Sequence, residues 1–90
     1  MKRTHVIPLT DVLSTELPGQ EVVLLHIQRG EYYTLNETGA LIWQGIQQQQ
    51  ALEAVSQTLA ARYGLTPEAA HTHVMQLVEE LATEQLVTLV

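Results

Sequence analysis

The sequence predicts a small α+β domain in which a three-stranded antiparallel sheet is followed by three helices. Residues 12–35 contain β-type apolar runs separated by turn residues. Helix-capping signals begin at Asn36, and apolar residues at helical spacing fill most of the rest. The 90 residues fit one domain, residues 1–90, with one core and the helices on one face of the sheet.

The strand region contains three runs. Residues 12–16 predict the first strand, and the turn sequence Leu-Pro-Gly-Gln follows at residues 17–20. Residues 21–27 are apolar on both faces, which is typical of a central strand with cover on each face. Residues 28–30 then turn the chain into the third strand, residues 31–35.

The third strand carries two adjacent tyrosines. By the two-residue period of a strand, Tyr33 and Leu35 point toward the core, while Tyr32 and Thr34 point the other way. An isolated tyrosine pair is more often part of a core than of a binding surface. This strand is the last of the sheet and has an open edge, so we expect one tyrosine in the core and the other available to an incoming extended peptide.

The first helix follows the third strand without a loop. Asn36 is a good N-cap because its side-chain oxygen can accept from the amide of Thr38 or Gly39, so the helix should begin at Glu37. Its apolar residues cover a wide arc, which predicts a largely buried helix. The glutamines at residues 47–50 then form a polar link.

Two more helices follow the glutamine link. The second runs to Tyr63 and can end at Gly64 in a left-handed conformation. The third begins after the Thr66-Pro67-Glu68 signal and extends to about residue 84. Residues 86–90 predict a short final strand. The apolar positions that define these helices are Leu52, Val55, Leu59 and Tyr63, and then Ala70, Val74, Leu77, Val78 and Leu81.

The charge and the absence of cysteine exclude several classes of partner and site. The formal net charge of −6 repels nucleic acids and anionic membranes, so neutral or basic partners are expected. The lack of cysteine excludes disulfides and thiolate metal sites and is compatible with a cytoplasmic location. The first nine residues are too short and interrupted for a signal sequence or a membrane span.

The sequence contains no pattern typical of an enzyme. Ser14 and Ser56 lie in no nucleophile motif, and no glycine-rich phosphate-binding pattern is present. His71 and His73 are two residues apart on a predicted helix and project in different directions, so they cannot share a metal ion. We therefore expect no catalysis, no cofactor and no bound metal.

Acidic residues on the third strand and third helix have two interpretations. Such residues most often form only a solvated face. Alternatively, a groove between the third strand and the third helix would use them to attract a peptide containing Lys or Arg. The residues concerned are Glu31, Glu68, Glu79, Glu80 and Glu84.

Three segments resemble the PqqD-like family. They are the apolar run at residues 22–25, the stretch from Gly30 to Trp43 and the sequence Leu-Ala-Ala-Arg-Tyr at residues 59–63. The most specific part is Leu-Asn-Glu-Thr-Gly, residues 35–39. One departure lies before the second helix, where Gln50 and Ala51 replace the threonine cap usual in the family and make that helix start less stable.

The resemblance implies a recognition element for ribosomally made, post-translationally modified peptides, with a winged helix-turn-helix-like fold. The resemblance implies that the protein is not an enzyme. Its implied role is to bind the leader of a precursor peptide and present it to a leader protease or another maturation enzyme. The leader adds to the third strand and lies against the third helix. Within this group, a freestanding leader-binding protein of lasso-peptide biosynthesis is favoured over the pyrroloquinoline-quinone pathway protein. The implied peptide-binding residues are Glu31, Tyr32, Tyr33, Thr34, Leu35, Ala70, His73, Val74, Leu77, Glu80, Leu81 and Glu84.

Two functions from other classes remain as alternatives. The second helix, the turn at Gly64 and the third helix have the order of a nucleic-acid-binding helix-turn-helix, but the third helix has acidic residues and no Lys or Arg. The protein could instead be a structural adaptor that docks through apolar surface. The open edge of the third strand also permits a weak homodimer.

Overall fold

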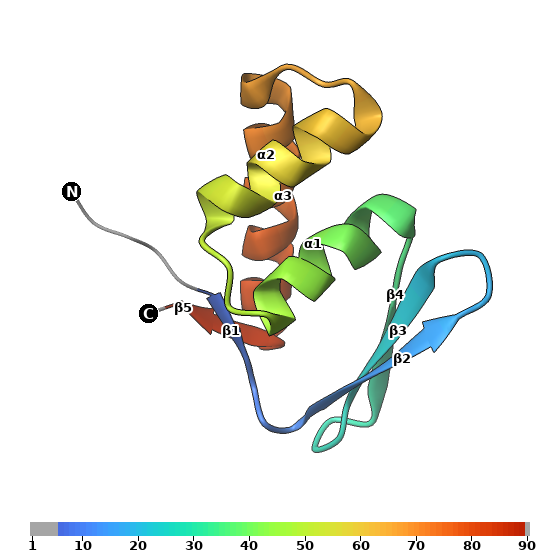
Figure 1. Cartoon of the computed structure of the whole chain (residues 1–90). Helices are drawn as coiled ribbons and strands as arrows, with labels where there is room; N and C mark the ends of the chain where they lie inside the picture. Colours follow the sequence, from blue (N-terminus) through green and yellow to red (C-terminus); the bar gives the residue numbers. More distant parts are fainter. Residues whose placement is uncertain (1–5, 90) are drawn as a thin grey trace.

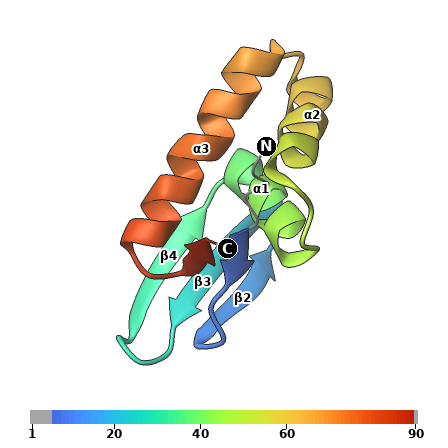
Figure 2. The same cartoon turned by 90° about the vertical axis from the view of Figure 1, so that its left-hand side faces the viewer.

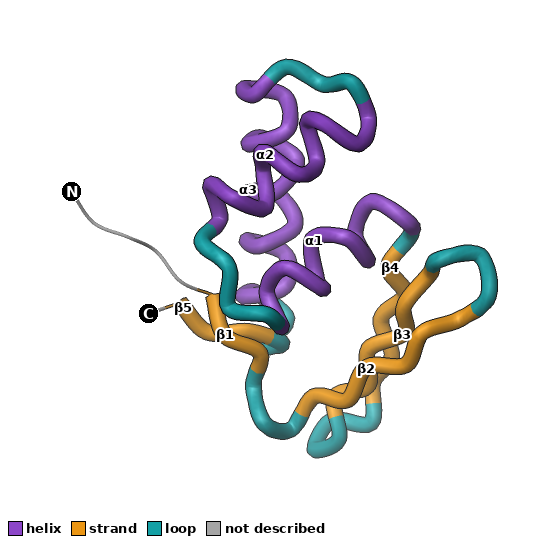
Figure 3. Tube along the Cα trace, viewed as in Figure 1, coloured by secondary structure: helices purple, strands orange, loops and turns teal. Residues whose placement is uncertain are grey.

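The computed structural model describes residues 6–89 and contains two small antiparallel sheets and three helices (Figure 1). One sheet has the order β2-β3-β4, and the other pairs β1 with β5. Figure 3 shows the strands at one side of the molecule and the helices stacked beyond them. The elements are β1 Val6–Pro8, β2 Val12–Leu17, β3 Glu21–His26, β4 Glu31–Leu35, α1 Glu37–Gln47, α2 Leu52–Tyr63, α3 Pro67–Thr83 and β5 Val87–Leu89.

The predicted α+β class and the three-stranded sheet followed by three helices are confirmed. The structure adds β1, which the sequence did not predict. β1 pairs with β5, so Val6 lies opposite Leu89 near the other end of the chain. β5 falls within the predicted final strand, of which Val90 lies outside the described residues.

β3 is the central strand, as predicted, but only one of its faces is fully covered. Val22, Leu24 and His26 are buried, whereas Val23 and Leu25 are partly exposed. The expectation of cover on both faces is therefore wrong. Figure 1 shows the helices on one side of the β2-β3-β4 sheet, and no described element packs on the other side, which we call the outer face. A strand with one covered face and a strand with two covered faces can have the same apolar composition. The sequence of β3 therefore does not show whether its second face is covered.

α1 covers the inner face of the sheet. The predicted cap is confirmed, because Asn36 Oδ1 accepts the amide of Gly39 at 2.9 Å and the helix begins at Glu37. Ile42, Trp43 and Ile46 are almost fully buried beneath the sheet and the other helices. β4 and α1 are thus joined by the single residue Asn36, which fixes the start of α1 beside the end of the strand.

α2 and α3 pack against each other, with α2 crossing α3 obliquely in Figure 1, and α3 runs alongside the β4 end of the sheet (Figure 2). Gly64 ends α2 with φ +64°, and the Thr66 hydroxyl accepts the amide of Ala69 at 3.1 Å at the start of α3. After α3, the amide of Leu86 donates to the carbonyl of Leu81 at 2.8 Å. The chain then turns into β5, which pairs with β1 and contacts α3.

The two helix starts predict opposite effects of capping substitutions on stability. Ala51 has extended N-cap geometry but supplies no capping bond, whereas Thr66 does. We expect Ala51→Ser to raise the free energy of unfolding by about 1 kcal/mol and Thr66→Ala to lower it by a similar amount. Urea unfolding followed by Trp43 fluorescence measures both. An Ala51→Ser protein no more stable than wild type would contradict this account of the α2 start.

Candidate functional site

The main-chain groups of β3 show how β4 is oriented. The amide of Ile27 donates to the carbonyl of Asp11 at 2.8 Å, across the pair formed by Val12 and His26. In an antiparallel ladder, bonds in these flanking positions mark a non-hydrogen-bonded pair. The amide and carbonyl of His26 therefore turn away from β2 and toward β4.

The same alternation determines which groups of β4 face the free edge. His26 pairs with Glu31, so Glu31, Tyr33 and Leu35 direct their main-chain groups toward β3. The amide and carbonyl groups of Tyr32 and Thr34 consequently face outward. β4 is the last strand of its sheet in the described structure, so these four groups lie at an open edge.

A hollow of about 450 Å³ lies beside this edge, between β4 and α3. Tyr33, which is half-buried, and Leu35, which is buried, both line it, and their inward direction is as predicted from the strand period. Tyr32 is 71% exposed and projects from the outer face. The lining residues are Tyr32, Tyr33, Thr34, Leu35, Leu77, Glu80, Leu81, Glu84 and Leu86.

A second hollow of about 240 Å³ adjoins the first along α3. The two share Leu77 and Glu80, so we treat them together as the β4–α3 groove. Gly39 contributes to the second hollow from the first turn of α1. The lining residues are Asn36, Thr38, Gly39, Ile42, His73, Gln76, Leu77 and Glu80.

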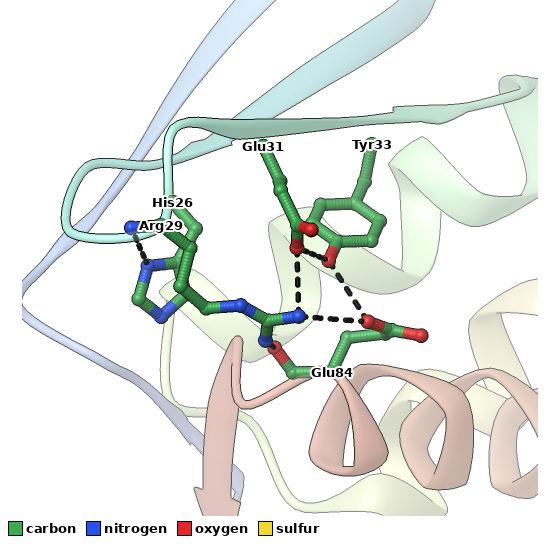
Figure 4. A network of polar contacts seen from close by, with 5 residues as sticks. All are labelled: His26, Arg29, Glu31, Tyr33 and Glu84. Atoms are coloured by element: carbon green, nitrogen blue, oxygen red, sulfur yellow. Dashed lines mark hydrogen bonds and ion pairs between the residues drawn. The ribbon is translucent and has the colours of Figure 1, made fainter.

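A polar network joins the two walls of the groove at the end near the β3–β4 turn (Figure 4). The Tyr33 hydroxyl lies 2.7 Å from Glu31 Oε1 and 2.8 Å from Glu84 Oε1. Arg29 Nη2 lies 2.7 Å from Glu31 Oε1, and Arg29 Nη1 donates to the main-chain carbonyl of Glu84 at 2.8 Å. Residues from the turn, from β4 and from the end of α3 therefore meet at one point.

The network raises the pKa of the Tyr33 hydroxyl. Its hydrogen bond to Glu31, its partial burial and its hydrogen bond to Glu84 raise the pKa of Tyr33 above the ordinary value, and the nearby Arg29 offsets this only in part. A tyrosine hydroxyl is a donor at neutral pH in any case, and the raised pKa extends this to more alkaline pH. The hydroxyl has one hydrogen, which it can donate to only one of the two carboxylates at a time. The positive charge of Arg29 must therefore offset the negative charge of the other carboxylate.

The structure brings most of the predicted site residues together. Eight of them line the first hollow, and His73 lines the second hollow. Glu31 lines neither hollow but is hydrogen-bonded to the hydroxyl of Tyr33, which lines the first. Ala70 and Val74 are fully buried in the core and reach neither hollow. They are on the apolar face of α3, as helical spacing indicates, but that spacing does not separate positions facing the core from positions facing a groove.

Arg29 was missed as a site residue by the sequence analysis. Its contact with Glu84 spans 55 positions, and no local pattern predicts it. The available signal was its isolation, because Arg29 is the only Lys or Arg between Arg3 and Arg62. A single cation beside the acidic start of β4 favours an ion pair with nearby carboxylates.

The described residues offer little for other kinds of site. Within residues 6–89, no three His, Asp or Glu side chains gather in a way that could hold a metal ion. None of the helices in that range has the length and apolar character needed to cross a membrane. α3, which would be the recognition helix of a DNA-binding protein, contains Glu68, Glu79 and Glu80 and no Lys or Arg.

Two solved structures resemble this chain over nearly its whole length. One is described as "TbiB1 in Complex with the TbiA(beta) Leader Peptide"; it is 26% identical, with a TM-score of 0.85 over 90% of this chain and 93% of that one. The other is described as "Lasso peptide synthetase B1 complexed with the leader peptide"; it is 25% identical, with a TM-score of 0.86 over 93% and 98% of the two chains.

No curated protein sequence matches the chain. The family model for coenzyme PQQ synthesis protein D (PqqD) matches residues 21–87, which include β3, β4, all three helices and the beginning of β5. This range contains both walls of the β4–α3 groove and exceeds half of the chain. The protein therefore belongs to the PqqD family.

Proposed function

We propose that this protein is a non-catalytic recognition element that binds the leader of a ribosomally made precursor peptide and delivers it to a leader protease or another maturation enzyme. The observation that carries the proposal is the open edge of β4 beside the β4–α3 groove, in a fold shared with two proteins solved with leader peptides. One of those proteins is described as a lasso peptide synthetase B1, which supports the proposal of a role in lasso-peptide biosynthesis.

The leader would bind by adding a strand to β4. Main-chain bonds to the outward groups of Tyr32 and Thr34 would hold it without regard to its sequence. Leader side chains opposite Glu31, Tyr33 and Leu35 would point toward α3, because residues opposite one another in a sheet share a face. A segment of about five residues would span about 17 Å of edge.

Side chains in the groove would provide the specificity. The residue opposite Tyr33 would enter the first hollow near Leu77 and Leu81. The residue opposite Leu35, two positions along the leader, would lie toward the second hollow near Ile42. Because a few main-chain bonds contribute modest affinity, the leader should carry apolar anchors at these alternate positions.

Charge supports a basic leader. Glu80 lies at the junction of the two hollows and Glu84 at one end of the groove, while the whole chain has a net charge of −6. A leader with Lys or Arg near its anchors would associate faster at low salt. The same charge argues against nucleic acid as the partner.

The outer face of the sheet supports a role in delivery. Exposed apolar side chains gather there from β2, β4 and the β3–β4 turn, including Leu13 at 54%, Ile27 at 51% and Tyr32 at 71% exposure. Leader residues opposite Tyr32 and Thr34 would project on this face and extend it. We therefore place the docking of the maturation enzyme on the outer face, where it would contact the protein and its bound leader together.

Strand addition predicts that Thr34→Pro weakens leader binding. Proline removes an amide that faces the open edge but participates in no bond to β3, so the fold should persist. Fluorescence polarisation with a labelled peptide covering the leader of the precursor encoded in the same gene cluster should show at least a tenfold higher Kd. Thr34→Ala retains the amide and should stay within threefold of wild type. Equal binding by the two variants would exclude this edge as the binding site.

Docking on the outer face predicts a separation of leader binding from delivery. Leu13→Glu places a charge on β2, which lies on the outer face at the opposite edge of the sheet from β4, so the leader Kd should not change, whereas precursor processing by the cognate enzyme should fall at least tenfold. Leu89→Glu is the matched control, because Leu89 is 53% exposed but lies on β5. If Leu13→Glu supports processing as well as Leu89→Glu does, the enzyme docks elsewhere.

A further inference from the structure

Arg29 connects three parts of the molecule that build the β4–α3 groove. It lies in the β3–β4 turn, and its guanidinium reaches both the start of β4 and the end of α3 (Figure 4). One nitrogen donates to the carbonyl of Glu84 at 2.8 Å, and the other lies 2.7 Å from Glu31 Oε1 and 3.6 Å from Glu84 Oε1. The two walls of the groove are therefore linked through one side chain.

The contact suits arginine and the end of a helix. Glu84 is the C-cap of α3, where main-chain carbonyls lack helical partners and carry partial negative charge. The last turn of α3 contains no basic residue, so the cation comes from another element. The planar guanidinium can serve a carbonyl and a carboxylate at once, which a lysine ammonium cannot do in the same geometry.

The turn holds Arg29 in the orientation that this contact needs. The amide of Arg29 lies 3.4 Å from Nδ1 of His26, which is only 5% exposed. The amide of Gly30 donates to the carbonyl of His26 at 2.8 Å, and Gly30 has φ +66°, a conformation that favours glycine. The folded turn thus fixes the backbone of Arg29 beside the start of β4, from which its side chain reaches Glu31 and Glu84.

We propose that Arg29 is a positioning residue that sets the width of the β4–α3 groove at the end near the turn. Without it, Glu31 and Glu84 would lie on either side of the Tyr33 hydroxyl, which has one hydrogen to share between them. The two carboxylates would repel each other and the end of α3 would move away from β4. With Arg29 present, the groove has its binding shape before a peptide arrives.

This inference rests on the proposed function, because a prearranged groove matters most for a peptide that adds to β4. Ordering one wall of the groove during binding would reduce the affinity. The effect should appear mainly as faster dissociation of the leader, since differences in affinity between variants of one interface reside mostly in dissociation rates.

The first test uses the protein without any peptide. In Arg29→Met, which keeps an apolar stem but loses the charge and donors, hydrogen exchange at the amides of Glu84, Gln85 and Leu86 should accelerate about tenfold. Arg62→Met is the matched control, because Arg62 lies in the last turn of α2 and its loss changes the net charge equally. Unchanged exchange at those amides in folded Arg29→Met would overturn the role of Arg29 in holding α3.

The second test measures binding of the labelled leader described above. Arg29→Met should raise the Kd about tenfold, Arg29→Lys should have an intermediate effect and Arg62→Met should stay within twofold. In the exchange test without peptide, adding Glu84→Gln to Arg29→Met should slow exchange at the amides of Gln85 and Leu86 at least threefold, because it removes the repulsion, whereas a purely structural loss would not be reversed by a second substitution.

The outcomes separate the two proposals. If wild-type protein binds no leader but Arg29→Met still accelerates exchange, the proposed function fails and the structural role of Arg29 stands. If the leader binds wild type and Arg29→Met equally while exchange accelerates, the proposed function stands and the positioning role is overturned.

Discussion

The register of the β2-β3-β4 sheet, which determines the direction in which each main-chain amide and carbonyl points, is the constraint on which the rest of the structure depends. β4 commits the main-chain groups of Glu31, Tyr33 and Leu35 to β3, which leaves those of Tyr32 and Thr34 at the open edge. A slip of one residue would exchange these sets and turn Tyr33 and Leu35 away from α3. The burial of Leu35 and the half-burial of Tyr33 oppose such a slip, because it would move both side chains to the outer face. One register therefore defines both the free groups and the groove beside them.

An open edge has a cost for the isolated protein as well as a use. Exposed strand edges invite pairing with other chains, and the outer face adds apolar surface beside this one. A weak homodimer through β4 would occupy the same amides and carbonyls that we assign to the leader, so the two would compete. The negative net charge opposes self-association but favours a basic peptide. Charge would thus help to select the guest, while main-chain bonding and apolar anchors would hold it.

Local signals predicted the elements, and long-range contacts account for what was missed. Asn36 is the N-cap that its position indicates, since capping depends on residues within one turn. β1 was not predicted because its three residues form a strand only by pairing with β5 at the far end of the chain. Within the site, the inward direction of Tyr33 followed from the strand period, but the burial of Val74 and the link from Arg29 to Glu84 depend on how α3 packs. Those features are properties of the tertiary structure, which no short pattern in the sequence contains.

Amide hydrogen exchange of β4 with and without the leader tests the central claim most directly. If the leader adds as a strand, the amides of Tyr32 and Thr34 should exchange at least tenfold more slowly in the complex, because each gains a main-chain acceptor. The amides of Glu31, Tyr33 and Leu35 already point toward β3 and should change less. A leader that binds tightly but leaves Tyr32 and Thr34 unprotected, or that protects β2 instead, would contradict strand addition at β4.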